Sequence, residues 1–188
     1  MSRLTSYDPI RAGCSDGSGS FVNDKAQLRA VSSAYKPSQK IVSDPNRTIF
    51  IGRLNLDTKE EVVESFFKKF GKIKSYRLVR DIVTGLSRGY AFIEFERKKD
   101  AESAAHAGHH AMIDGNQIIV EMELERILPG WKPRRLGGGL GGNKRSGQLR
   151  FGGKELPFRN NILSLKSSHK HTQDRVGRLS HPKTSDRG

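Results

Sequence analysis

The chain has few of the residues and runs that several classes of protein need. Cys14 is the only cysteine among 188 residues, so the chain can form no intrachain disulfide and offers no thiolate zinc site. The longest uninterrupted apolar run, residues 90–93, is far too short for a membrane span. The first 20 residues lack the apolar centre of a signal peptide. We therefore expect an intracellular protein in a reducing compartment, with no membrane partner.

Acidic side chains are also scarce relative to basic ones. The chain carries 34 Lys and Arg against 20 Asp and Glu, a formal net charge of +14. By segment, this charge is +3 over residues 1–47, zero over 48–126 and +11 over 127–188. Such an excess favours polyanions or acidic surfaces as partners. We expect the third segment to supply most of that attraction.

No set of residues predicts catalysis or metal binding. His106, His109 and His110 have no cysteine or acidic cluster beside them in the sequence to complete a metal site, and we expect them to face solvent. No nucleophile, base and orienting group are evident together. The sequence thus predicts no enzyme, no cofactor and no small-molecule substrate.

The uncharged middle segment has the periodicity of alternating strands and helices. We predict strands at 48–52, 73–78, 88–96 and 117–123, a helix opened by a capping box at 58–61, and a second helix packed through 101–108. Outside this segment, a short helix is expected at 23–35. The order is βαββαβ, in which two helices cover one face of a four-stranded sheet and leave the other face uncovered.

The stretch RGYAFIEF, residues 88–95, is apolar on both faces. Because side chains alternate along a strand, its alanine, isoleucine and second phenylalanine face the core, while Tyr90 and Phe92 face away with Arg88 beside them. Phe50 takes the same outward position in TIFIG, residues 48–52. These three rings either stack on a ligand or are covered by further protein, and the residues alone leave both alternatives open.

The stretches IFIGRL (49–54) and RGYAFIEF resemble the RNP2 and RNP1 motifs of the RNA recognition motif family. The resemblance implies an α+β, ferredoxin-like fold with a four-stranded antiparallel sheet, two helices on one face, and flexible N- and C-terminal extensions. It also implies that the outward rings stack two or three unpaired bases and that Arg88 contacts a phosphate. Glu121 and Glu123, expected outward on the last strand, are predicted to accept hydrogen bonds from base amino groups.

One position departs from the general family pattern, and the departure is informative. Arg53 stands where RNP2 usually has a small polar residue, as in the branch found in small nuclear ribonucleoproteins (snRNPs). The run ERILPGWKPRRLGGGLGG, residues 125–142, resembles the segment that follows the domain in that branch. There Trp131 is an expected anchor against the domain or a base. The predicted phosphate contacts are Lys132, Arg134 and Arg135, and Lys144 and Arg145 are further predicted RNA-binding residues.

The glycines of this run allow close approach of the backbone to an RNA groove, although a flexible linker is the alternative interpretation. We therefore divide the chain into an N-terminal extension (1–47), an RNA recognition motif (48–126), a Gly/Arg-rich RNA-binding extension (127–159) and a basic disordered tail (160–188).

The flanks, including residues 7–13 and 146–159, resemble the minor-spliceosome members of the snRNP branch. This resemblance implies a nuclear, non-catalytic subunit that recognises a small nuclear RNA stem-loop and supports 5′ splice-site recognition in rare introns, with other snRNP proteins as partners. The alternatives are a major-spliceosome counterpart, a general pre-mRNA binder, and an adaptor whose sheet face binds protein.

Overall fold

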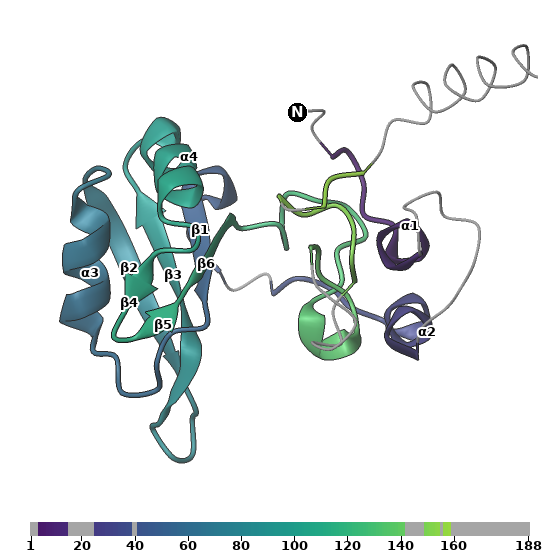
Figure 1. The fold of residues 1–188 in the computed structure, drawn as a ribbon, viewed down its shortest axis with the longest axis horizontal. Helices are drawn as coiled ribbons and strands as arrows, with labels where there is room; N and C mark the ends of the chain where they lie inside the picture. Colours follow the sequence, from purple (N-terminus) through teal and green to yellow (C-terminus); the bar gives the residue numbers. More distant parts are fainter. Residues whose placement is uncertain (1–3, 15–24, 39–40, 142–148, 155, 159–188) are drawn as a thin grey trace, which may run out of the picture.

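The computed structural model describes residues 4–14, 25–38, 41–141, 149–154 and 156–158. These residues form two bodies that lie side by side (Figure 1). The first, which we call the domain, spans residues 41–123. The second, the flanking unit, comprises the described residues before 39 and after 123. No helix among the described ranges is long and apolar enough to cross a bilayer.

The domain contains one four-stranded antiparallel sheet, in the order β2-β3-β1-β6. The chain passes through β1 (Thr48–Gly52), α3 (Glu60–Lys68), β2 (Ile73–Arg80), β3 (Ser87–Phe95), α4 (Lys98–Ala107) and β6 (Ile119–Met122). The predicted order βαββαβ is therefore confirmed. A one-turn 3-10 helix, η1 (Pro45–Arg47), leads into β1.

Both helices pack on the same face of the sheet, as the alternation in the strands predicted. Ile49 and Ile93 from the sheet are fully buried against Phe67 of α3. The small side chains of Ala101 and Ala104 let α4 lie close to the strands. The other face, which we call the open face, carries no helix of the domain (Figure 1).

The region of the predicted fourth strand is divided in two. Instead of one strand over 117–123, β5 (Asn116–Gln117) pairs with β4 (Met112–Ile113) in a separate ribbon, and β6 begins at Ile119. The Nδ1 atom of His109 lies 2.9 Å from the carbonyl oxygen and 3.2 Å from the backbone nitrogen of Val120. His109 is therefore half-buried against the start of β6, and its predicted exposure to solvent was wrong.

The predicted capping box before α3 was also wrong. The N-cap residue is Lys59, which makes no side-chain capping hydrogen bond. Thr58 instead donates its hydroxyl to Oδ2 of Asp114 at 2.8 Å. Because Asp114 lies in the turn between β4 and β5, this tertiary partner displaces the local capping bond that the sequence suggested.

The flanking unit combines segments from both ends of the chain. It contains α1 (Pro9–Gly13), α2 (Lys25–Ser32) and the 3-10 helix η2 (Arg134–Leu136). The helix predicted at 23–35 is confirmed over a shorter range, whereas α1 was not predicted. The unit has its own small core, made by Tyr7, Ala12, Leu128, Leu140 and Leu149.

Tyr7 is the centre of this second core. Its hydroxyl donates to the carbonyl of Gly139 at 2.9 Å, and its ring meets Trp131 edge-on with centroids 5.0 Å apart. Its backbone nitrogen also donates to Pro129 at 2.9 Å. Burial raises the pKa of Tyr7 above its ordinary value, so the hydroxyl remains a donor. One tyrosine thus joins the N-terminal segment to the segment after the domain.

The glycine run serves this packing. Gly137 has a φ of +85°, and a Cβ there would lie 2.2 Å from the carbonyl oxygen of Ala26 in α2. Gly141 similarly packs against Gly153. Gly137 and Gly141 thus bring protein backbone against protein backbone, an arrangement that neither the RNA-groove interpretation nor the linker interpretation anticipated.

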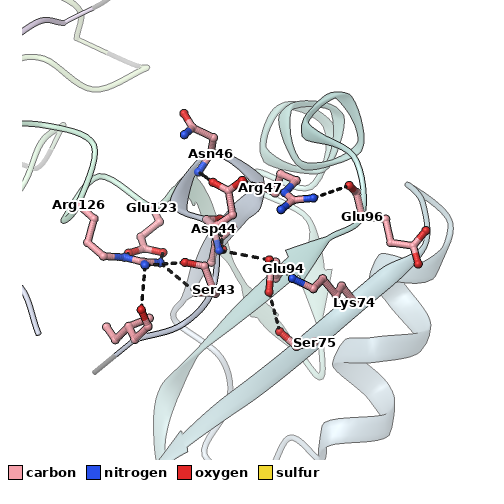
Figure 2. A network of polar contacts seen from close by, with 12 residues as sticks. Ser43, Asp44, Asn46, Arg47, Lys74, Ser75, Glu94, Glu96, Glu123 and Arg126 are labelled. Atoms are coloured by element: carbon pink, nitrogen blue, oxygen red, sulfur yellow. Dashed lines mark hydrogen bonds and ion pairs between the residues drawn. The ribbon is translucent and has the colours of Figure 1, made fainter. Parts of the chain in front are cut away.

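A polar clasp joins the chain entering the domain to the chain leaving it (Figure 2). Arg126 donates to both carboxylate oxygens of Glu123, at 2.6 and 2.8 Å, and to the backbone carbonyl and side chain of Ser43. Ser43 precedes β1 and Arg126 follows β6. The clasp therefore holds together the two chain segments that lead from the domain to the two halves of the flanking unit.

Candidate RNA-binding face

Three aromatic rings gather on the open face, as predicted. Phe50 pairs directly with Phe92 across β1 and β3, and their ring centroids are 5.6 Å apart. Tyr90 lies 5.9 Å from the ring of Phe50 and 6.1 Å from that of Phe92. All three are half-buried, while the alternate residues Ala91 and Ile93 are in the core. The face therefore presents a contiguous aromatic platform.

Two arginines border this platform. The guanidinium of Arg88 lies 5.8 Å from the ring centroid of Tyr90, where it flanks the aromatic cluster. Arg77 in β2 pairs directly with Phe92, so its exposed side chain shares the open face. Arg77 was not among the residues predicted to bind RNA. Leu78 is buried and side chains alternate along a strand, so the preceding residue is expected to face outward.

One end of the open face is closed by a carboxylate network (Figure 2). Glu94 is only 4% exposed and accepts from Lys74 at 2.9 Å, Ser75 at 3.2 Å and the backbone nitrogen of Asp44 at 3.2 Å. Burial alone would raise the pKa of Glu94, but these donors outweigh it and lower the pKa below its ordinary value. The accessible platform therefore ends at Phe92.

The two glutamates predicted to read bases are placed differently from each other. Glu121 pairs directly with Phe50 and lies half-buried on the open face, as expected. Glu123 lies just beyond β6, is 4% exposed and is held by Arg126. The expectation that Glu123 faces outward was wrong, because the clasp at the end of the strand takes up its carboxylate.

Arg53 lies at the opposite end of the platform from Glu94. It follows Gly52, which pairs with Tyr90, and its side chain is exposed. Its φ of +62° lies in the left-handed region that residues other than glycine seldom adopt. The fold holds Arg53 in this conformation at the edge of the aromatic cluster.

The RNA-binding residues predicted in the segment after the domain differ in their surroundings. Some contact other parts of the flanking unit, and others are exposed. Trp131 is half-buried and packs edge-on against Tyr7, while its predicted contact with a base stays a prediction. The ammonium of Lys132 donates a hydrogen bond to the carbonyl oxygen of Ser33, just after the end of α2. Arg135 is exposed, with its guanidinium 5.3 Å from the ring centroid of Tyr35. Lys144 and Arg145 lie outside the described residues.

Arg134 connects the flanking unit to the open face. From η2, its guanidinium reaches within 3.8 Å of the carboxylate of Glu121, and it donates to Leu140 at 3.5 Å. Burial lowers the pKa of Arg134, and the charge of Arg53 lowers it further, while Glu121 acts in the opposite direction. The flanking unit therefore places a cation beside the aromatic platform.

Within the described ranges, no group of three or more His, Cys, Asp or Glu side chains is arranged to hold a metal ion. The chemistry that the open face offers is stacking by rings and attraction by guanidinium groups. Both are suited to a ligand that combines flat aromatic groups with negative charge.

Comparison with known proteins agrees with this arrangement. The sequence model of the RNA recognition motif family matches residues 49–119 of this chain. The chain is 46% identical over 182 residues to the U11/U12 small nuclear ribonucleoprotein 35 kDa protein of Mus musculus, covering 96% of this chain and 75% of that protein. It is 49% identical over 156 residues to the protein of that name in Homo sapiens, covering 83% and 63%.

A second group of relatives is more distant. The U1 small nuclear ribonucleoprotein 70 kDa homolog of Schizosaccharomyces pombe is 42% identical over 120 residues, which cover 63% of this chain and 46% of that protein. The match to the 35 kDa proteins extends through the flanking segments as well as the domain. The chain therefore belongs to the family of U11/U12 small nuclear ribonucleoprotein 35 kDa proteins.

Proposed function

We propose that the chain is a nuclear RNA-binding subunit of a minor-spliceosome snRNP, which recognises a small nuclear RNA stem-loop and supports 5′ splice-site recognition in rare introns. The observation that carries the proposal is the aromatic platform of Phe50, Tyr90 and Phe92, bordered by arginines and left uncovered by the domain's helices. Each base stacked there would contribute about 1–3 kcal/mol.

The two bodies divide the work of recognition in this proposal. Residues 48–126, which include all the strands and both helices of the domain, carry no net charge. Long-range electrostatic attraction to RNA therefore contributes little to the affinity of the domain. Its platform holds bases of the loop, which are unpaired and can present their faces to the rings. The basic segment after it, together with the basic N-terminal segment, binds phosphates of the stem. Other snRNP proteins are the expected protein partners.

The names of the relatives favour this assignment over the alternatives. The 35 kDa proteins are named for the U11/U12 particle, whereas the more distant 70 kDa homolog is named for U1. Higher identity to the first group supports the minor-spliceosome assignment. A protein-binding adaptor is the alternative of another class, in which a partner covers the three rings.

RNA recovered from nuclear extract tests the proposal. The full chain, tagged and captured, is expected to enrich one minor-class small nuclear RNA on sequencing, and Tyr90→Ala or Phe92→Ala is expected to abolish that enrichment. Tyr76→Ala is the matched control, because Tyr76 is exposed but pairs with the core residue Ile93. Enrichment of a major-class RNA, of many messengers or of none would each reject the assignment.

A further inference from the structure

Among the described residues, Arg134 and Lys154 both approach the carboxylate of Glu121 where the flanking unit meets the open face. Arg134 reaches Glu121 from η2 at 3.8 Å, a distance longer than that of a good charge-assisted hydrogen bond. Lys154 lies beside the same strand and donates to the carbonyl of Val120 at 3.4 Å. These two cations outnumber the one carboxylate, so the described side chains at this junction carry more positive than negative charge.

Arg134 has donors to spare at this position. A guanidinium carries five N–H donors. Among the described residues, Arg134 donates to Leu140 at 3.5 Å and lies at ion-pair distance from Glu121. Its side chain is only 27% exposed, so water cannot fully solvate the charge. A partly buried cation that the described residues give two acceptors is suited to an incoming anion.

Arg53 approaches the same place from the sheet. Glu121 pairs with Phe50, and Gly52 two residues further along β1 pairs with Tyr90. Arg53 follows β1 directly, three residues after Phe50, and its side chain is exposed. The charge of Arg53 is close enough to lower the pKa of Arg134. Two like charges are thus held near each other beside the rings.

The backbone conformation of Arg53 adds an independent observation. A φ of +62° is unfavourable for a non-glycine residue, and such a conformation persists where the surrounding structure enforces it. Glycine would adopt this conformation without cost. The presence of an arginine there indicates a use for the side chain rather than for the turn.

We propose that Arg53 and Arg134 together bind one backbone phosphate of a nucleotide whose base stacks on Phe50. This inference rests on the proposed function, since it takes the open face to bind RNA, and it identifies the group that bridges the two bodies. Binding one phosphate between the arginines relieves their mutual repulsion and attaches the flanking unit to the sheet through the ligand.

The test uses the full chain and a stem-loop RNA selected in vitro for binding to it. Each loop phosphodiester is replaced in turn by an uncharged methylphosphonate. One replacement is expected to weaken binding of the unmodified chain about tenfold, as removal of a charge-assisted hydrogen bond should. The same replacement is expected to weaken binding of Arg53→Gly and Arg134→Gln less than twofold, because each variant lacks a guanidinium to bind that phosphate.

Two controls separate phosphate binding from folding and from general charge. Arg53→Gly is expected to be at least as stable as the unmodified chain, since glycine accepts the positive φ. Arg29→Gln removes one exposed positive charge from α2 and is expected to keep the full tenfold sensitivity. If the two arginines map to different phosphates, or if neither variant changes the sensitivity, the proposal is overturned.

The result of the phosphate mapping does not depend on whether the natural RNA is a small nuclear RNA. Recovery of a minor-class RNA from extract, combined with failure of the phosphate mapping, would reject the shared phosphate alone. Failure to select any binding RNA would reject both proposals. Successful mapping on a selected RNA, without recovery of a small nuclear RNA, would keep the phosphate site and reject the biological assignment.

Discussion

The domain and the flanking unit differ in what holds them together. The domain buries large apolar side chains at regular positions, such as Ile49, Ile93 and Phe67, between a sheet and two helices. The flanking unit relies on a few buried side chains, close glycine packing and single hydrogen bonds, such as that from Tyr7 to a carbonyl 132 residues away. A small core built this way is expected to be the more easily disrupted of the two.

The domain and the flanking unit also differ in net charge. The domain segment is neutral, and the excess lies in the segments that build the flanking unit or continue from it. Specific recognition by the rings and general attraction by the cations are therefore assigned to separate bodies. A change made in one body and measured in both tests this separation.

The largest effect is expected from a charge placed in the domain core. Ile93→Asp puts a carboxylate at a fully buried position with no partner, a cost that we expect to exceed about 4 kcal/mol. Circular dichroism should show loss of the domain's secondary structure. Tyr90→Ala, at a nearby position on the open face, should remain folded. A folded Ile93→Asp variant would mean that this face of β3 is not the core.

Removal of the segment after the domain should have the next largest effect, on RNA affinity. A chain ending at Arg126 is compared with one ending at Gly153, each titrated with the selected stem-loop over a range of salt concentrations. For each phosphate that only the longer chain binds, the magnitude of the salt slope should be about 0.7–0.9 lower in the shorter chain. Equal slopes for the two chains would show that the segment binds no phosphate.

A glycine substitution should disrupt the flanking unit alone. Gly137→Ala combines a φ of +85° with a Cβ 2.2 Å from the Ala26 oxygen, so about 2–4 kcal/mol of local stability should be lost. Hydrogen exchange should accelerate in α2 but not in β1. Gly115→Ala is the control, because its φ is +79° with nothing near the added Cβ. Equal exchange in α2 for both variants would refute the predicted packing.

A smaller effect is expected from pH, through Glu94 in the domain. The pKa of Glu94 is lower in the folded state, so its stabilising contribution is present above its ordinary value near 4.5 and is lost as pH falls through the lowered value. The free energy of unfolding in urea should therefore fall on acidification. Glu94→Gln should show a shallower fall over that range, whereas an unchanged pH dependence would contradict the assignment.

The smallest effect is expected from one hydroxyl. Tyr7→Phe removes the hydrogen bond to Gly139 but keeps the ring against Trp131, so about 1 kcal/mol of stability should be lost from the flanking unit. Hydrogen exchange around residues 128–140 reports this change. Tyr7→Ala, which also removes the ring, should cost more. Similar exchange in both variants would place the contribution in the hydroxyl rather than in the aromatic packing.

Prediction succeeded where a residue's role follows from its immediate neighbours. Alternation in TIFIG and RGYAFIEF separated the buried isoleucines from the outward rings. Prediction failed where a distant partner intervened. Thr58 bonds to Asp114 instead of capping α3, and Glu123 is taken up by Arg126 instead of facing a base.

The flanking unit shows the same limit on a larger scale. Its two halves lie on either side of a complete domain, so no local period shows which residues of one half pack against the other. Trp131 and Lys132 were singled out in the sequence for RNA binding, and their contacts with Tyr7 and Ser33 were not predicted. Arg77 was missed for a simpler reason, since its strand was traced only through its apolar residues.

The sequence by itself determined the order of elements, the core face of the sheet and the chemistry of the open face, because these depend on the local periodicity of apolar side chains. Only the tertiary structure decided that the two flanks form one body and that Arg134 meets Glu121 beside Phe50. Those arrangements depend on glycine backbones and single polar atoms brought together from distant segments, and such pairings leave no repeating pattern in the chain.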